Sequence, residues 1–164
     1  ATLLERTPGY GKVIVATHDI REGEVVIVAS NSGVNPVPIE VVLESQAIGA
    51  KTIAITSDEY YQDAPSRHES GKRLAEVADL TIDTRVPKGD ALVSIPGIET
   101  PAGGASTVIG VTIINAIVVE TAAQLAQRGV KPPLIPTMNL PGGDEEMAAL
   151  IDQWGDRLPL LHRA

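Results

Sequence analysis

A buried strand that leads directly into a polar loop constrains this chain more than any other feature. Residues 25–29 form a continuous apolar run, VVIVA, rich in β-branched side chains. Such a run is typical of a strand covered on both faces in a parallel sheet. The loop SNSG follows at residues 30–33, apolar residues recur at helical spacing over 39–47, and KTIAIT at 51–56 has the pattern of a second strand. This order predicts a right-handed βαβ unit.

The loop at residues 30–33 combines hydroxyl and amide side chains with a glycine that is free to adopt positive φ. In open α/β sheets, ligands bind beyond the carboxyl ends of the strands, and a helix N-terminus offers unpaired N–H groups to an anion. Such a loop suits a phosphate monoester. The alternative is a plain strand-to-helix turn, where Ser, Asn and Gly are common in any case. The residues alone leave both interpretations open.

Composition narrows the possible partners. The net charge of −8 disfavours nucleic acids and anionic membrane surfaces, which need clustered Lys and Arg. The sequence contains no Cys, and His18, His68 and His162 are too scattered to form a metal cluster, so we expect no metal and no cofactor. The 164 residues suffice for one domain with a core, which must consist of Val, Ile, Leu and Ala because Phe is absent.

The SNSG loop after a buried strand resembles the S-x-S-G phosphate loop of the SIS (sugar isomerase) domain family. Residues 30–57, SNSGVNPVPIEVVLESQAIGAKTIAITS, are similar to an uncharacterised prokaryotic branch of SIS-domain phosphosugar-binding proteins. The similarity continues through SRHESGKRLAEVADLTID at 66–83, GGASTVIGVTIINAIVVET at 103–121 and PGGDEE at 141–146. It covers most of the chain after about residue 20.

The resemblance implies an α/β fold of the SIS type, with three layers (α/β/α) around a parallel sheet of flavodoxin-like order. We expect one SIS-like domain over residues 1–164, with 155–164 as a tail. The family's N-terminal strand with its G-x-G-x-S loop has no counterpart here, so residues 1–22 are expected to be the remnant of a longer domain. Val13, Ile14 and Val15 favour a strand by propensity, whereas the family favours a helix over residues 10–20, which we adopt.

Further along the chain, the patterns predict a short helix at 70–77, a third strand at 79–83 and a short fourth edge strand at 91–95. Residues 100–105 are expected to be a loop, and Ser106 to cap a long apolar helix at 108–125. We expect this helix to be buried and also to contact a second subunit. Asn115, Glu120, Thr121 and Gln124 disfavour a membrane span. Asp144 is expected to cap the last helix, at 145–154.

The expected ligand site gathers the loop, the end of the second strand and the start of the long helix. Thr56 and Ser57 follow a strand parallel to the first and should lie at the same sheet edge, although Ser57 or Asp58 would equally cap the next helix. The resemblance implies that the hydroxyl side chains at the start of the long helix point into the pocket. The predicted ligand-binding residues are Ser30, Asn31, Ser32, Gly33, Asn35, Thr56, Ser57, Ser106 and Thr107.

Catalysis would require a base and an acid, because an aldose–ketose isomerase moves a proton between adjacent carbons. Glu120 is the candidate base and His68 the candidate acid or base, although His68 also fits a surface position. Arg67 suits either a bound phosphate or a surface pair with Glu69 or Asp63. The heptose-phosphate isomerase branch carries a catalytic His where this chain has Asn115, which weakens that particular reaction.

Two functions follow from the resemblance. The first is binding of a phosphosugar or related carbohydrate derivative, with sugar-phosphate isomerase activity as an open question. The alternative is a non-catalytic phosphosugar-sensing module that acts through a partner. A nucleotide-binding domain is disfavoured because neither G-x-G-x-x-G nor a P-loop pattern is present. We expect a cytoplasmic homodimer that binds no nucleic acid and no membrane.

Overall fold

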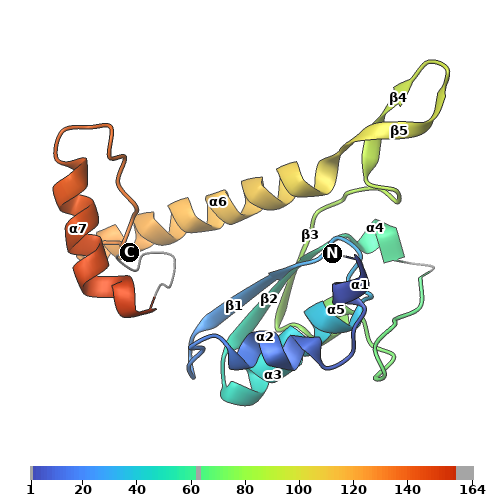
Figure 1. Ribbon diagram of the computed structural model, residues 1–164, viewed down its shortest axis with the longest axis horizontal. Helices are drawn as coiled ribbons and strands as arrows, with labels where there is room; N and C mark the ends of the chain where they lie inside the picture. The colour runs from blue at the N-terminus through green and yellow to red at the C-terminus, as the bar shows by residue number, and fades with distance from the viewer. Residues whose placement is uncertain (1, 62–63, 158–164) are drawn as a thin grey trace. The chain divides into compact units, whose positions relative to one another are not determined.

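The computed structural model describes residues 2–61 and 64–157, and the chain divides into two compact units, Ala1–Ile113 and Ile114–Ala164. In the first unit the elements are α1 (Thr2–Glu5), α2 (Tyr10–Ala16), β1 (Val25–Ala29), α3 (Pro36–Ile48), β2 (Lys51–Thr56), α4 (Asp58–Tyr61), α5 (Leu74–Val77), β3 (Leu80–Asp83), β4 (Ala91–Ile95) and β5 (Ile98–Gly104) (Figure 1). Helix α6 (Ala105–Gln127) continues into the second unit, which also holds α7 (Gly143–Trp154) and a 3-10 turn, Gly155–Arg157.

Strands β1, β2 and β3 form a parallel sheet in that order, which confirms the predicted α/β class and βαβ unit. Helices α3 and α5 pack against the sheet, and α2 packs against α3, on the same side (Figure 1). The core beneath the sheet consists of residues with 0% exposed surface: Ile39, Val42, Ala54 and Leu74. These are the Val, Ile, Leu and Ala side chains that a chain without Phe must use.

A polar clamp joins the starts of β2 and β3. The backbone N–H and the hydroxyl of Thr52 donate to Asp79 Oδ2 at 2.8 and 2.9 Å, and Asp79 N donates back to Thr52 Oγ1 at 3.1 Å. Gln46 Nε2 donates to Thr52 Oγ1 and to the carbonyl of Val77. These hydrogen bonds lower the pKa of Asp79, the backbone donor having the largest effect.

The N-terminal segment is helical at Tyr10–Ala16, as predicted from the resemblance rather than from β propensity. Glu40 of α3 holds this segment, because its buried carboxylate accepts from Gly9 N at 2.6 Å and from Gly11 N at 2.8 Å. Helix α3 begins at Pro36, three residues before the predicted start. Proline is tolerated in the first turn, where an N–H has no partner within the helix.

The predicted fourth edge strand does not join the parallel sheet. Ala91–Ile95 instead pairs antiparallel with β5, and the segment 100–104 expected to be loop belongs to that strand. Pro96 and Gly97 connect the two strands, and Gly97 has a φ of +78°. A two-residue connection with positive φ is typical of a hairpin, and this local turn determined the pairing.

Three predicted helix starts also need correction. Helix α6 begins at Ala105, so Ser106 lies in its first turn; the backbone N–H of Ser106 donates to the carboxylate of Asp90 at 2.7 Å. Helix α7 begins at Gly143 after Gly142 as N-cap, so Asp144 lies inside the helix. The helix expected at 70–77 covers only Leu74–Val77, because Arg73 forms its cap with Glu76.

The expectation that the long apolar helix is buried is wrong for the described part of the chain. Of the 23 residues of α6, only Ala105 is buried, while Val108 and Val119 are 67% and 68% exposed. With a mean hydropathy of 1.8 over 18 residues, α6 is long and apolar enough to cross a bilayer. This is weak evidence by itself, since core helices of other proteins meet the same criterion. Of the predicted tail, residues 158–164 lie outside the described residues.

Candidate ligand site at the carboxyl end of β1

A pocket of about 380 Å³ opens at the carboxyl end of β1. Three of the predicted ligand-binding residues contribute to its lining, which consists of Glu5, Ala29, Ser30, Asn31, Ser32 and Asp90. The position agrees with the general rule for open α/β sheets, because the loop that follows a parallel strand forms the binding edge.

Hydrogen bonds to β2 and to the residue after it hold the loop in place. Ser30 N donates to the carbonyl of Ile55 at 3.0 Å, which extends the β1–β2 ladder into the loop. The carbonyl of Asn31 accepts from Ser57 N at 3.3 Å and from Thr56 Oγ1 at 3.5 Å. Thr56 and Ser57, both with 0% exposed surface, therefore support the loop from beneath and are not part of the pocket lining.

Gly33 also has a structural role in the loop. It has a φ of +53°, and a Cβ at this residue would lie 2.9 Å from Thr56 Oγ1 and 3.2 Å from Leu74 Cβ. Its carbonyl accepts from Leu74 N at 2.8 Å, and its own N–H donates to Ser30 Oγ at 3.2 Å. Glycine is required here because the backbone is left-handed and passes close to β2 and α5.

The loop retains unused donors. Among the described residues, the backbone N–H groups of Asn31, Ser32 and Val34 donate to no protein group. Pro36 and Pro38 remove N–H groups from the first turn of α3, so the donors available to an anion come mainly from the loop and less from the helix. Asn31 Oδ1 is buried and accepts no hydrogen bond within the described residues. An orphan acceptor costs roughly 1–3 kcal/mol.

Arg67 places a cation beside the loop. Its Nη1 donates to Asn35 Oδ1 at 2.7 Å, and its backbone N–H donates to the carbonyl of Val34 at 2.8 Å. Asn35 is 2% exposed and donates through Nδ2 toward Ser32 Oγ at 3.5 Å. The sequence left the partner of Arg67 open; the structure pairs it with Asn35, while Asp63 lies outside the described residues.

The remaining predicted site residues lie outside the lining of this pocket. His68 Nδ1 contacts Ser70 Oγ at 2.8 Å. Glu120 belongs to the second unit, where its Oε1 accepts from Gln124 Nε2 at 3.0 Å. Ser106 reaches the site only indirectly, through its bond to Asp90, and Thr107 is exposed.

Sequence reasoning missed Glu5 and Asp90. Asp90 is a non-glycine residue with a φ of +67°, in the turn that precedes β4. Its carboxylate accepts from Ser106 N and from Ser106 Oγ, so it caps α6 at a distance in sequence. The only local pattern near Asp90 is Pro87 and Gly89, which indicate a turn but not a ligand site. Neither residue carries a local pattern that links it to a loop from a distant part of the chain.

The carboxylate at the end of β3, on the far side of β2 from β1, already has partners. Asp83 Oδ1 accepts from Asp58 N and Arg85 N, and its Oδ2 lies 2.8 Å from Arg85 Nε. Burial alone would raise the pKa of Asp83, but these backbone donors and the charge of Arg85 lower it on balance. The carboxyl end of β3 therefore carries an ion pair between Asp83 and Arg85. The loop after β1, by contrast, has backbone N–H groups without a protein acceptor among the described residues.

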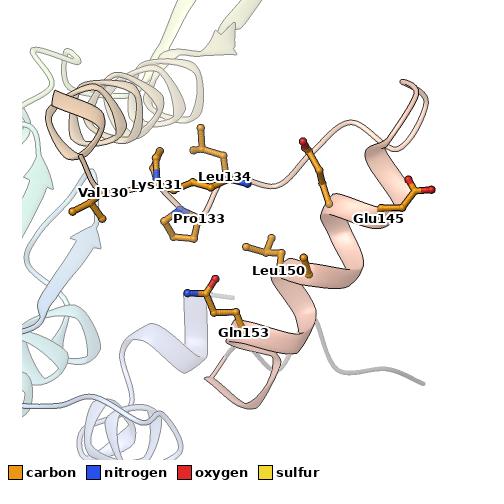
Figure 2. Close-up of a pocket in the computed structure, with 10 residues that line it drawn as sticks. Val130, Lys131, Pro133, Leu134, Glu145, Leu150 and Gln153 are labelled. Carbon is orange, nitrogen blue, oxygen red and sulfur yellow. The ribbon is translucent and has the colours of Figure 1, made fainter. Parts of the chain in front are cut away.

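A second pocket, of about 740 Å³, lies within the second unit. It is formed by the Pro-rich segment 130–134 and by α7, and Figure 2 shows Leu150 and Gln153 facing the segment that carries Pro133. Its lining is mainly apolar, and it includes none of the predicted site residues.

Comparison with known proteins identifies a domain in the first part of the chain. Residues 1–57, from α1 through the loop to the end of β2, match the SIS domain. These residues are similar to the SIS domain, as the S-x-S-G resemblance predicted. The β1 loop lies within the matched residues.

Relatives of this chain carry the name UPF0309 protein. One from Geobacillus thermodenitrificans (strain NG80-2) is 42% identical over 161 residues, covering 98% of this chain and 65% of the relative. One from Geobacillus sp. (strain WCH70) is 44% identical with the same coverage. A third, from Halalkalibacterium halodurans, is 39% identical over 158 residues, covering 96% of this chain and 63% of the relative. The chain thus spans just under two thirds of the length of these curated relatives.

Proposed function

We propose that this chain binds a phosphorylated sugar, or a related carbohydrate derivative, with the phosphate on loop 30–35. Similarity to the SIS domain favours a sugar phosphate in general. The observation that carries the proposal is the pocket at the carboxyl end of β1, lined by Ser30, Asn31 and Ser32 beside backbone N–H groups that have no protein partner among the described residues. Oriented N–H groups and hydroxyls are the donors that phosphate oxygens accept.

Arg67 supplies the charge that the loop lacks. A phosphate monoester carries about −1.5 to −2 charges at pH 7, and the loop itself offers only neutral donors. Arg67 is held by Asn35, whose Nδ2 in turn contacts Ser32. A hydrogen bond from a guanidinium to phosphate contributes roughly 1.5–3 kcal/mol. In this proposal Asn35 positions Arg67, and Thr56, Ser57 and Gly33 keep the loop in shape.

Binding is better supported than turnover. The proposed acid or base His68 is engaged with Ser70, and the proposed base Glu120 bonds within α6. Neither contributes to the pocket lining. Isomerase activity that uses these two residues stays a prediction, as do the roles of Ser106 and Thr107. We therefore favour a phosphosugar-sensing module that acts through a partner, because neither predicted catalytic residue lines the pocket.

We also propose a cytoplasmic homodimer in which a second copy covers α6. Its exposed side chains include Val108, Val111, Val118 and Val119, and Glu120 is the single charged residue in the helix. Apolar patches of this kind mark sites of association. A second copy, rather than a membrane, is proposed because Asn115, Glu120 and Gln124 would have to enter the bilayer.

Thermal unfolding in the presence of sugar phosphates tests the binding site. We expect millimolar concentrations of at least one phosphosugar to raise the Tm, and the matching unphosphorylated sugar to leave it unchanged. Ser32→Ala and Arg67→Gln should each weaken affinity about ten-fold, which corresponds to about 1.4 kcal/mol. Ser66→Ala, outside the pocket lining, is the control. If no phosphosugar in a broad panel raises the Tm, the proposed function is wrong.

NMR in heavy water separates binding from isomerisation. An aldose–ketose isomerase exchanges the proton at C2 of its substrate with solvent, so a sensing module should bind a sugar phosphate without deuterium incorporation. Incorporation that disappears in His68→Gln and Glu120→Gln would establish the catalytic roles and overturn the sensing proposal.

Sedimentation equilibrium tests the dimer. We expect the mass of two chains in aqueous buffer, without detergent. A monomer in buffer, or a chain that requires detergent to remain in solution, would contradict the proposal that a second copy covers α6.

A further inference from the structure

We propose that α6 of a second copy of this chain covers the open face of the parallel sheet β1–β2–β3, with the partner's Glu120 beside Lys51. The inference rests on the proposed homodimer, because it names the surface of one copy that α6 of the other copy meets. It concerns assembly of the chain and is independent of the ligand at the pocket after β1.

The sheet has one covered face and one open face. Neighbouring strands direct the side chains of paired residues to the same side. On the covered face, Val28 and Ala54 are in register and belong to the core under α3 and α5. The other face presents apolar side chains from both outer strands that are exposed: Val25 (56%), Ile27 (37%) and Leu80 (55%). Ile55, further along the same side of β2, is 2% exposed, so the open part lies toward the amino ends of the strands. Parallel sheets are ordinarily covered on both faces, so a layer is lacking here.

The open face has the size of one helix. Three strands about 4.8 Å apart place the outer two roughly 10 Å from each other, which is about the diameter of a helix with its side chains. Helix α6 itself lacks cover: of its 23 residues, all in the described part of the chain, only Ala105 is buried. Residues 105–113 belong to the same compact unit as the sheet, yet the open face stays exposed, so this part of α6 does not cover it.

The two surfaces also match in chemistry. Apolar residues occur all around α6, a pattern typical of a helix that is buried on several sides. The single charged residue of the helix is Glu120, and Ile113 and Ile117 precede it on the same side, at spacings of four and three residues. On the open face, the single charge carried by the strands is Lys51, which is followed on that side of β2 by Ile53. A row of isoleucines that ends in a carboxylate thus meets an apolar face that ends in an ammonium group.

A second copy fits this arrangement better than a different protein. A different protein would have to supply an apolar helix of its own, and it would leave α6 without cover. In a two-fold dimer every contact occurs twice, so one partner covers both the sheet and the helix of each copy. Neither Lys51 nor Glu120 takes part in an ion pair among the described residues. Each therefore has a charge to offer to the other copy.

Two valines of similar exposure give a matched test of the open face. Val25→Gln changes the open face, whereas Val13→Gln changes α2 on the covered side, where Val13 is 53% exposed. By sedimentation equilibrium, we expect Val25→Gln to weaken association at least ten-fold and Val13→Gln to leave it unchanged. Urea unfolding checks that both variants retain the fold. Equal association of the two variants would show that the open face is not the interface.

Disulfide cross-linking tests the pairing directly, because the chain contains no Cys. A tagged Lys51→Cys chain is refolded from urea together with an untagged Glu120→Cys chain and is then oxidised with copper phenanthroline. We expect a product with the summed mass of the two chains, at least five-fold more abundant than in a mixture of Lys12→Cys with Glu120→Cys. Lys12 is the control because it is an exposed lysine of α2, on the covered side of the sheet.

A chain that carries both Lys51→Cys and Glu120→Cys separates the second copy from the chain's own helix. A disulfide between two chains supports the inference, whereas a disulfide within one chain would show that α6 covers its own sheet and would overturn it. If the native chain is a dimer but neither test singles out the open face, the inference is wrong and the dimer stands. If the native chain is a monomer or requires detergent, both proposals are wrong. Should Val25→Gln misfold, the cross-link decides alone, because Lys51 is exposed.

Discussion

The β1 loop and helix α6 were both predicted from clear sequence patterns, but they differ in how much of the protein packs around them. Loop 30–35 is fixed by hydrogen bonds with Ile55, Thr56 and Ser57, and its Gly33 lies close to Leu74 of a core with no exposed surface. Helix α6 is equally apolar in composition, but its side chains are exposed in the described part of the chain. The βαβ unit contains its own packing partners. The apolar surface of α6 has no comparable cover among the described residues.

The largest expected effect of a substitution follows from the packed side of this comparison. Leu74→Ala should reduce the free energy of unfolding by about 2–5 kcal/mol, because Leu74 has 0% exposed surface and lies in the core cluster. The control, Leu80→Ala on β3, should cost about 1 kcal/mol because Leu80 is 55% exposed. Urea unfolding measures both. Equal losses would contradict a core centred on α3 and α5.

Gly33→Ala tests the loop itself and should cost about 2–4 kcal/mol. The left-handed backbone contributes roughly 1–2 kcal/mol, and the new Cβ would lie 2.9 Å from Thr56 Oγ1. Gly71→Ala is a matched control, because Gly71 has a φ of +70° and no heavy atom within 4 Å of a Cβ. That variant should show the backbone strain alone. If both variants lose the same stability, the close approach of the loop to β2 does not contribute.

The sequence predicted the regions in which local pattern and tertiary contact agree. The apolar run of β1, the Gly-containing loop and the helical spacing before β2 each have neighbours close along the chain, so the βαβ unit followed directly. The hairpin β4–β5 was misassigned because strand propensity identifies a strand but not its partner. Its turn at Pro96 and Gly97 was the better signal. The burial of α6 was misjudged because hydropathy cannot say what covers a helix.

The candidate site divides in the same way. Ser30, Asn31 and Ser32 were predicted from consecutive residues, and all three contribute to the pocket lining. Glu5 and Asp90 join them from distant elements, and neither belongs to a motif. The sequence left the partner of Arg67 open, and only the fold brings its guanidinium to Asn35. Local chemistry thus predicts the loop, whereas the charged residues around it depend on the topology.

A smaller effect is expected at the clamp between β2 and β3. The hydrogen bonds from Thr52 lower the pKa of Asp79 in the folded chain, so its ionised form stabilises the fold above the unfolded pKa of about 3.9. That contribution is lost as the pH falls through the lower, folded pKa. Asp79→Asn retains the shape but removes the charge. Urea unfolding at pH 7 and pH 3 should therefore show a smaller pH-dependent loss for the variant. Identical losses in the two chains would mean that the ionisation of Asp79 does not contribute to the pH dependence of the free energy of unfolding.

A substitution on α6 is expected to change folding stability least, and it tests directly whether this helix is covered by a second copy. Val119→Gln should change the free energy of unfolding by less than about 0.5 kcal/mol at high dilution, because Val119 is 68% exposed and Gln is a good helix former. If a second copy covers this helix, the same substitution should weaken association at least ten-fold, since it removes an apolar contact of roughly 1.5–3 kcal/mol from each copy. Sedimentation equilibrium measures the association and urea unfolding the stability. A variant that unfolds readily but associates like the native chain would place Val119 inside a core, and the contrast between the self-contained βαβ unit and the uncovered helix would then be lost.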